Sequence, residues 1–414
     1  MMRSTSAAIV ATLAVLAAAP LAAQTVTPTQ TGQDMRVDAS GGVGYDDDVF
    51  ATTGGQPSSV PLQASGGYSS LGLALTYSAV GRRTSFGASA DSSLRYYRVE
   101  DGVTAHSYGG SVGATTELTR RLRVTGNVYS QRASHHIFWL FPVLGETPLG
   151  QITPPSLDYT LNATDGHSVD ADANMTYRFT ARSSATAEYG RGYSRFGVDE
   201  LERERWSARY EYGVSRYATL RLGYGREDAD YVGTNHYSRR TIDAGVEYSR
   251  PLSFSRKTTL NFRAGSSGLD DGQNKYYTVI GYVNLSHQLS RNWAVHAGYD
   301  RSIGFINGFL EPFLASSVMT NVTGTMGRRV ELSASVGYSD GNIGFTAAPT
   351  ENGYVTYTAG GRVRVLLARN LSAYGEYIHY HYEFEDDVDL PLRSPHRLNR
   401  RGVRGGLSYT IVVF

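Results

Sequence analysis

Arg209-Tyr-Glu-Tyr-Gly-Val-Ser215 and Leu220-Arg-Leu-Gly-Tyr-Gly-Arg226 are two stretches, separated by a short break, in which large apolar residues alternate with polar or small ones. A period of two places successive side chains on opposite faces of an extended chain, so it indicates β-strands rather than helices. In the second stretch the two leucines and the tyrosine share one face, while Arg221 shares the other with the glycines. The short break between the stretches predicts a tight turn, and hence a β-hairpin.

The same alternation continues from Met35 to Phe414 in segments of roughly ten to thirteen residues, long enough to cross a membrane as tilted strands. Short breaks alternate with longer, more variable links. This order predicts an all-β, transmembrane, up-and-down antiparallel β-barrel of about eighteen strands, with sixteen as the alternative count. The short turns would lie on the periplasmic side and the long loops outside the cell. A soluble propeller fits less well, because each of its blades needs four short strands per repeat.

The two faces of the strands differ in charge, and this decides which face points inward. An Arg or Lys that faces lipid at mid-depth costs about 2–4 kcal/mol, so the ionic face should line the lumen. The expected lining residues are Asp91, Arg95, Asp170, Asp172, Arg178, Glu188, Arg205, Arg209, Arg221, Asp243, Glu247, Arg263, Asp300, Arg362 and Arg364, and Glu117 and Arg404 follow the same pattern. Their charges would either set a transverse field that filters solutes, or pair as salt bridges that stiffen the wall.

The composition supports a barrel over a bundle of transmembrane helices. The 414 residues include 30 Tyr, 46 Gly and no Cys, and the mean hydropathy is −0.31. This is too polar for a helical bundle, whereas a barrel gives lipid only every second strand residue. The net charge is +1 and predicts no nucleic-acid partner. Eighteen strands enclose a bore wide enough for an aqueous channel.

The N-terminus reads as a secretory signal peptide over residues 1–23. Arg3 supplies the positive start, and the apolar run Ala7–Ala19 is too short to span a bilayer. Residues 24–34 would form a polar periplasmic lead-in, and residues 35–414 the barrel with its long extracellular loops. A retained N-terminal anchor helix is the alternative.

Three loop features are candidate sites. The longest loop, 134–165, carries an apolar run and four prolines, and would fold into the bore, cap its mouth or pack on its neighbours. The acidic runs at 46–48 and 385–389 are either solvated loop tips or Ca²⁺ ligands, although neither has EF-hand spacing. The histidine pairs at 135–136 and 379–381 lack a recognisable catalytic partner, and the second pair fits an interfacial aromatic belt together with Tyr380 and Tyr382.

Two local motifs resemble a known family. Gly44-Tyr-Asp-Asp-Asp-Val-Phe50 is similar to the GYDxNVF motif of the β-barrel porin type 2 family, with Asp48 in place of Asn. Leu289-Ser-Arg-Asn292 and Leu367-Ala-Arg-Asn370 resemble its LSRN periplasmic turns. The resemblance covers nearly the whole chain after the signal peptide. It implies an outer-membrane component of exopolysaccharide export and transfers no catalytic residue.

The sequence therefore predicts a pore for hydrophilic solutes in the outer membrane of a Gram-negative bacterium, with a role in polysaccharide export as its narrower version. The alternative is a barrel that transports nothing, either an adhesin or scaffold, or a membrane-embedded hydrolase. Expected partners are outer-membrane lipids, lipopolysaccharide, the barrel-insertion machinery and polysaccharide-export proteins. We expect no enzyme activity, cofactor or metal.

Overall fold

The structure is a computed structural model, and it describes residues 32–47, 66–98, 103–137, 159–196, 199–215, 217–233, 235–248, 258–305, 311–344, 352–385 and 396–414. In these ranges no helix is long and apolar enough to cross a membrane. The strands are β1 (Gly32–Asp46), β2 (Gly66–Val80), β3 (Thr84–Tyr97), β4 (Val103–Glu117), β5 (Leu122–Ile137), β6 (Tyr159–Arg178), β7 (Ser183–Phe196), β8 (Asp199–Gly213), β9 (Ala218–Tyr231), β10 (His236–Tyr248), β11 (Thr258–Asp270), β12 (Lys275–Ser290), β13 (Trp293–Gly304), β14 (Phe313–Met326), β15 (Val330–Ile343), β16 (Gly353–Leu366), β17 (Leu371–Phe384) and β18 (Arg397–Val412).

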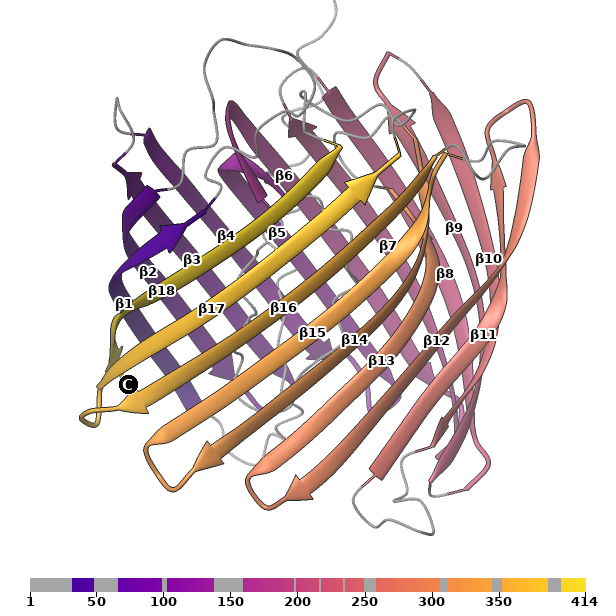
Figure 1. Ribbon diagram of the computed structural model, residues 1–414. Coiled ribbons are helices and arrows are strands. Elements are labelled where there is room, and N and C mark those ends of the chain that lie inside the picture. Colours follow the sequence, from indigo (N-terminus) through magenta and orange to yellow (C-terminus); the bar gives the residue numbers. More distant parts are fainter. Residues whose placement is uncertain are drawn as a thin grey trace, which may run out of the picture.

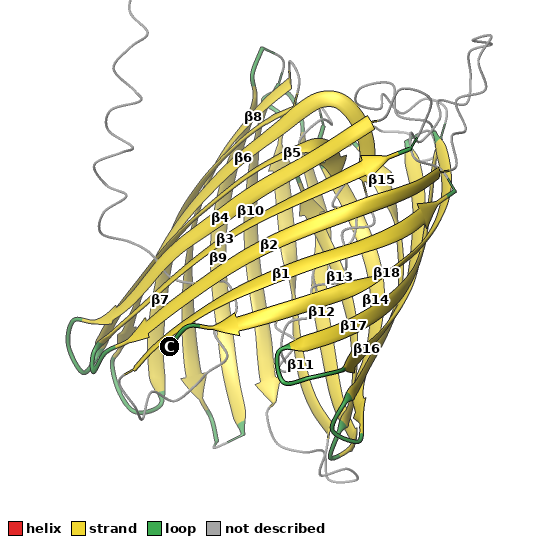
Figure 2. Ribbon diagram, turned by 90° about the vertical axis from the view of Figure 1, so that its left-hand side faces the viewer, coloured by secondary structure: helices red, strands yellow, loops and turns green. Residues whose placement is uncertain are grey.

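The eighteen strands form one closed antiparallel sheet (Figure 1). Each strand pairs with the strands before and after it in the chain, and β1 pairs with β18 to close the ring. Figure 2 shows this closure, with β2, β1 and β18 lying side by side. The prediction of an up-and-down barrel is confirmed, with eighteen strands rather than sixteen.

The outer face of the barrel is largely apolar. Residues that pair directly across neighbouring strands share a face, so the pairing rows show which side chains lie on it. One such row joins Tyr224, Ile242 and Ser266 across β9, β10 and β11. Ile242 is 65% exposed, and the other large exposed apolar side chains follow the same alternation. An apolar wall on a closed barrel belongs in hydrocarbon, where no backbone group is left without a hydrogen-bond partner.

The connections at one end of the barrel are longer than those at the other, but the difference is smaller than the sequence predicts. The expected long links 197–202, 230–236 and 269–275 are largely strand, because β7 to β12 extend further than their apolar alternation. The link between β11 and β12 is a turn at 271–274, in which Asp271 Oδ1 accepts hydrogen bonds from the backbone N–H groups of Gln273 and Asn274. Gly272 takes a φ of 87°, which favours glycine.

Both chain ends of the sheet lie at the end with the short hairpins (Figure 1). β1 begins at Gly32, so the last three residues of the expected lead-in belong to the barrel; the predicted signal peptide lies outside the described residues. β18 ends at Val412. Beyond it, Phe414 leaves the strand alternation and its ring lies 6.4 Å from that of Tyr77 on the outer face of β2.

Replacing Ile242 by Arg should lower the free energy of unfolding by about 2–4 kcal/mol, because the charge would face hydrocarbon. The measurement is the urea midpoint of the heat-modifiable gel band of the protein folded in lipid vesicles. Asn261→Arg is the matched control, since this exposed residue lies on the inner face of β11 and its replacement stays in water. Equal losses in the two variants would contradict the assignment of the faces.

Candidate functional site

The candidate site is the inner wall. All fifteen residues predicted to line the lumen lie on the face opposite the exposed apolar side chains, as their pairing rows require. They come from β3, β6 to β11, β13 and β16. The structure gathers many of them into two groups on opposite sides of the barrel, each with further ions.

The first group is built across glycines. Gly190 of β7 pairs with Asp172 of β6 on one side and with Arg205 of β8 on the other. The Arg205 guanidinium crosses the glycine and donates to the Asp172 carboxylate. A Cβ on Gly190 would lie 2.5 Å from Asp172 Oδ1 and 2.7 Å from Arg205 Nε. The bridge therefore requires a residue without a side chain at position 190.

The next row repeats this arrangement. Arg203 Nη2 of β8 donates to Asp170 Oδ1 of β6 at 3.0 Å, across Gly192 of β7. The alternation that places Arg205 on the inner face places Arg203 there too, so Arg203 could have been found from the sequence. Glu188, one row further toward the short turns, pairs across strands with Asn174 and Ser207, and is half-buried.

The group continues toward β11 with a local excess of positive charge. Arg221 pairs across Gly245 with Arg263, and its Nε lies 3.8 Å from Asp243 Oδ2. Arg209 Nε lies 2.9 Å from Glu211 Oε1 on the same strand. The Arg263 guanidinium lies over the ring of Tyr282, 5.2 Å from its centroid. Three guanidinium groups therefore share this part of the wall with two carboxylates.

The second group lies half a turn around the ring, on β15 to β18. Arg364 donates to Ser372 Oγ at 2.9 Å and to Glu331 Oε2 at 3.4 Å. Arg404 Nε donates to Glu376 Oε2 at 2.6 Å. Arg362 stacks over the ring of Tyr374 at 5.2 Å. Glu331 and Glu376 were not among the predicted residues.

The other predicted residues lie outside these groups. Arg95 lies over the ring of Tyr68, 5.9 Å from its centroid, and Asp300 accepts a hydrogen bond of 2.5 Å from Ser302. Asp91 faces Gly109 on β4. Arg178 and Glu247 are exposed at the ends of β6 and β10 next to the short turns.

Toward the long-loop end the inner wall becomes dry. Asp46 and Arg400 form an ion pair there with only 5% and 4% of their side chains exposed. Arg400 Nε lies 2.9 and 3.0 Å from the two Asp46 oxygens. Tyr97, Tyr380 and Tyr382 are fully buried nearby. Tyr380 and Tyr382 thus face inward, which corrects their assignment to the interfacial belt.

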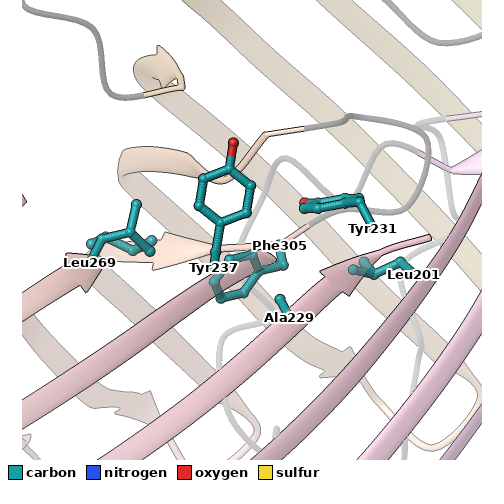
Figure 3. Packing of buried hydrophobic residues seen from close by; sticks show 7 residues of the cluster. Leu201, Ala229, Tyr231, Tyr237, Leu269 and Phe305 are labelled. Carbon is teal, nitrogen blue, oxygen red and sulfur yellow. The ribbon is translucent and has the colours of Figure 1, made fainter. Parts of the chain in front are cut away.

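The end of β13 forms the other dry region. Ile303 and Phe305 pack against Leu201, Ala229, Tyr231, Tyr237 and Leu269, which line the inner faces of β8 to β11. Figure 3 shows Phe305 lying beside Tyr237 and Ala229. Arg239 donates to the backbone O of Ile303, its guanidinium lies 5.7 Å from the ring centroid of Phe305, and it pairs with buried Glu227.

This inward packing places a constriction near the long-loop end. Loop 134–165, which would fold into the bore, cap its mouth or pack on its neighbours, falls mostly outside the described residues. Only its edges at 134–137 and 159–165 are described, as backbone of β5 and β6. Among the described residues, the end of β13 and Leu314 at the start of β14 pack against the inner wall here.

The described histidines lie in other contacts, and of the acidic runs only residues 46, 47 and 385 are described. His381 stacks on Tyr357 with ring centroids 4.4 Å apart, and His379 Nε2 lies 2.8 Å from Asn399 Oδ1. Asp47 Oδ1 accepts the backbone N–H of Arg401, so the start of the run 46–48 holds β18 rather than a cation. The side chains of His135 and His136 lie outside the described residues. In the described part of the chain no three His, Cys, Asp or Glu side chains could hold a metal ion.

Comparison with known proteins finds similar solved structures but no family. No family model matches the chain, and no curated protein matches it. OpdO of Pseudomonas aeruginosa is 12% identical with a TM-score of 0.48, over 92% of this chain and 98% of that one. OccAB4 of Acinetobacter baumannii is 11% identical with a TM-score of 0.45, over 93% and 100%. The FrpB iron transporter of Neisseria meningitidis is 8% identical with a TM-score of 0.45, over 93% and 83%.

The location of the protein follows from its own geometry. A closed barrel of membrane-crossing strands, apolar outside and ionic inside, is an architecture of the Gram-negative outer membrane. The protein is an outer-membrane β-barrel. The resemblance to the β-barrel porin type 2 family stays a resemblance, because no family model supports it.

Gly190→Ala should lower the free energy of unfolding by about 1–3 kcal/mol, because the added methyl group forces Asp172 and Arg205 apart. Gly375→Ala is the control: this glycine lies on the outer face of β17 with no atom within 4 Å of an added Cβ. Urea midpoints in vesicles measure both. If Gly190→Ala were as stable as the control, the bridge across the glycine would be excluded.

Proposed function

We propose that this barrel is a pore for hydrophilic solutes. The supporting observation is that ions of the inner wall stay exposed. The side chains of Arg205 and Glu331, on opposite sides of the bore, are 45% and 46% exposed. Ionic side chains that stay exposed inside a closed tube require water there, because an unpaired charge in a dry interior is very costly. A water-filled tube with an apolar outer wall provides a path across the membrane.

The inner charges support a pore over a purely structural barrel. A scaffold would need its inner charges paired and dry, as Asp46 and Arg400 are. Arg263 instead faces Tyr282, and no carboxylate contacts its guanidinium among the described residues. Such a group leaves its positive field in the bore and attracts anions.

Purified protein in planar lipid bilayers should give stepwise conductance. The inner face carries hydrophilic groups of both signs, so small salts and neutral sugars should pass. Absence of steps at every voltage, for protein whose heat-modifiable band shows that it is folded, would reject the pore and favour the adhesin or scaffold alternative.

Arg263→Gln should lower the permeability of chloride relative to potassium. A unit charge about 10 Å from a passing ion in water contributes about 0.4 kcal/mol, which is about two-fold in local ion concentration. The effect should shrink at high salt, because screening shortens the reach of the charge. The reversal potential in a salt gradient measures the ratio. Arg240→Gln is the control, since Arg240 lies in the outer row of β10 with Gly268. A change equal to that of the control would contradict an inward field from Arg263.

Polysaccharide export, which the resemblance implies, is a narrower version of the same proposal and stays a prediction. It requires that oligosaccharides enter the bore and reduce the current in a concentration-dependent way. The stacked arginine–tyrosine pairs at Tyr282 and Tyr374 offer polar and aromatic faces that suit sugars.

We further propose that lipopolysaccharide contacts the outer face near the long-loop end of β7 to β9. Above the aromatic pair Trp206 and Tyr224, whose ring centroids are 5.6 Å apart, this face becomes ionic. Arg191 pairs with Glu202 at 3.3 Å, and Arg226 with Asp228 at 2.9 Å. An aromatic band below charged groups is the pattern expected at a headgroup region.

A further inference from the structure

The wall of the barrel has a seam between β12 and β13. The ladder between these strands begins at Gly281 and Arg301 and continues to the short-turn end. Beyond that pair, toward the long loops, β12 keeps its ladder with β11 and β13 keeps its ladder with β14. On the outer face of β12 at the seam, Tyr277 and Val279 are 77% and 69% exposed.

The seam exists because the end of β13 lies inside the bore. Ile303 belongs to the outer-face row of β13 with Tyr299, yet it packs on the inner faces of β8 to β11. The face of β13 that meets lipid lower down therefore meets the inner wall here. Arg239 holds this position through its hydrogen bond to the backbone O of Ile303 and its contact with the Phe305 ring.

The same residues also fit the wall. Continuing the register of Gly281 and Arg301 would pair Val279 with Ile303 and Tyr277 with Phe305. All four side chains would then point outward, and all four are apolar, like the outer-face residues further down these strands. The apolar side chains of this strand end are thus compatible with two positions. In one the strand end packs on the inner wall, and in the other it pairs with β12.

One side chain occupies the seam in place of the missing ladder. Arg301 Nε donates to the backbone O of Val279 at 3.2 Å, and its Nη1 donates to Ser316 Oγ at 2.9 Å. The first bond uses a carbonyl that ladder pairing would otherwise use. Moving the strand end into the wall would exchange this bond for backbone pairs. It would also exchange the inner apolar contacts of Ile303 and Phe305 for contacts with Val279 and Tyr277 of β12, at the edge of the outer leaflet. Both positions give Ile303 and Phe305 apolar neighbours, on the inner wall in one case and on β12 in the other.

We propose that residues 301–305, the last four residues of β13 and the one that follows, are a gate with these two positions. In the inward position it narrows the bore and leaves the seam open toward the outer leaflet. In the wall position it closes the seam and widens the bore. The effect on solute flow rests on the proposed pore, whereas the movement of the strand end does not depend on it.

Cysteine pairs test the movement directly, because the native chain has no Cys. The pair Val279→Cys with Ile303→Cys should form a disulfide in vesicles only when the strand end enters the wall. The pair Val283→Cys with Tyr299→Cys is the positive control, since these two residues face each other in the ladder. A thiol-specific polyethylene glycol reagent measures disulfide formation in both pairs. It shifts the gel band of protein with free cysteines and leaves the band of cross-linked protein unshifted.

The variant Glu227→Gln with Arg239→Gln removes the inner anchor without leaving a buried charge unpaired. In this background the Val279–Ile303 cysteine pair should close several-fold faster, whereas the control pair should not change. If the control pair closes and the seam pair closes in neither background, the movement is excluded. If the rate does not respond to the loss of the anchor, Arg239 does not hold the inward position.

Conductance then tests the gating. Oxidising the Val279–Ile303 cysteine pair should raise the single-channel conductance, and reduction should restore it. An Ala229→Cys and Phe305→Cys pair, which holds the inward position, should keep conductance low. Closure of the seam pair without a change in an otherwise normal conductance would overturn the gate. Absence of any channel would instead reject the proposed pore, while the cross-linking result would still decide the movement.

Discussion

Backbone hydrogen bonding in hydrocarbon is the constraint on which this structure depends. No water is available there, so each strand needs a neighbour on both sides, and the pairing of β1 with β18 meets this need for the whole ring. The seam between β12 and β13 opens only beyond Gly281. That point is ten residues from the first residue of the short turn, Arg291, about the length of a membrane-spanning strand segment. The ladder is thus continuous over about the length that must cross the hydrocarbon.

The sequence alone predicts the faces of the strands but not the partners across them. A period of two places Asp172 and Arg205 on the inner face. It does not give the register, which joins these two through Gly190 on the strand between them. The glycine carries no signal of its own in a single sequence. The strand count, the closure and the inner face were therefore within reach, whereas the ion pairs were not.

Glu376 lies opposite the predicted residues Arg362 and Arg404, whereas several of the other missed residues lie where strands extend past the membrane. There the outer face meets polar surroundings, so the alternation that identifies a strand is lost. Glu227 and Arg239 lie in such extensions of β9 and β10, beside Arg226 and Asp228 on the outer face. The sequence places Asp46 in a loop for the same reason, although this residue ends β1 and pairs with Arg400.

The bridges across Gly190 and Gly192 have a consequence for how this chain can vary. Three strands share each bridge, and the residue in the middle contributes only by having no side chain. A side chain at either glycine would displace the ionic side chains of β6 and β8 before it disturbed β7 itself. Aspartate, glycine and arginine at these positions should therefore be inherited as a unit, so that diverged relatives either keep all three or replace all three.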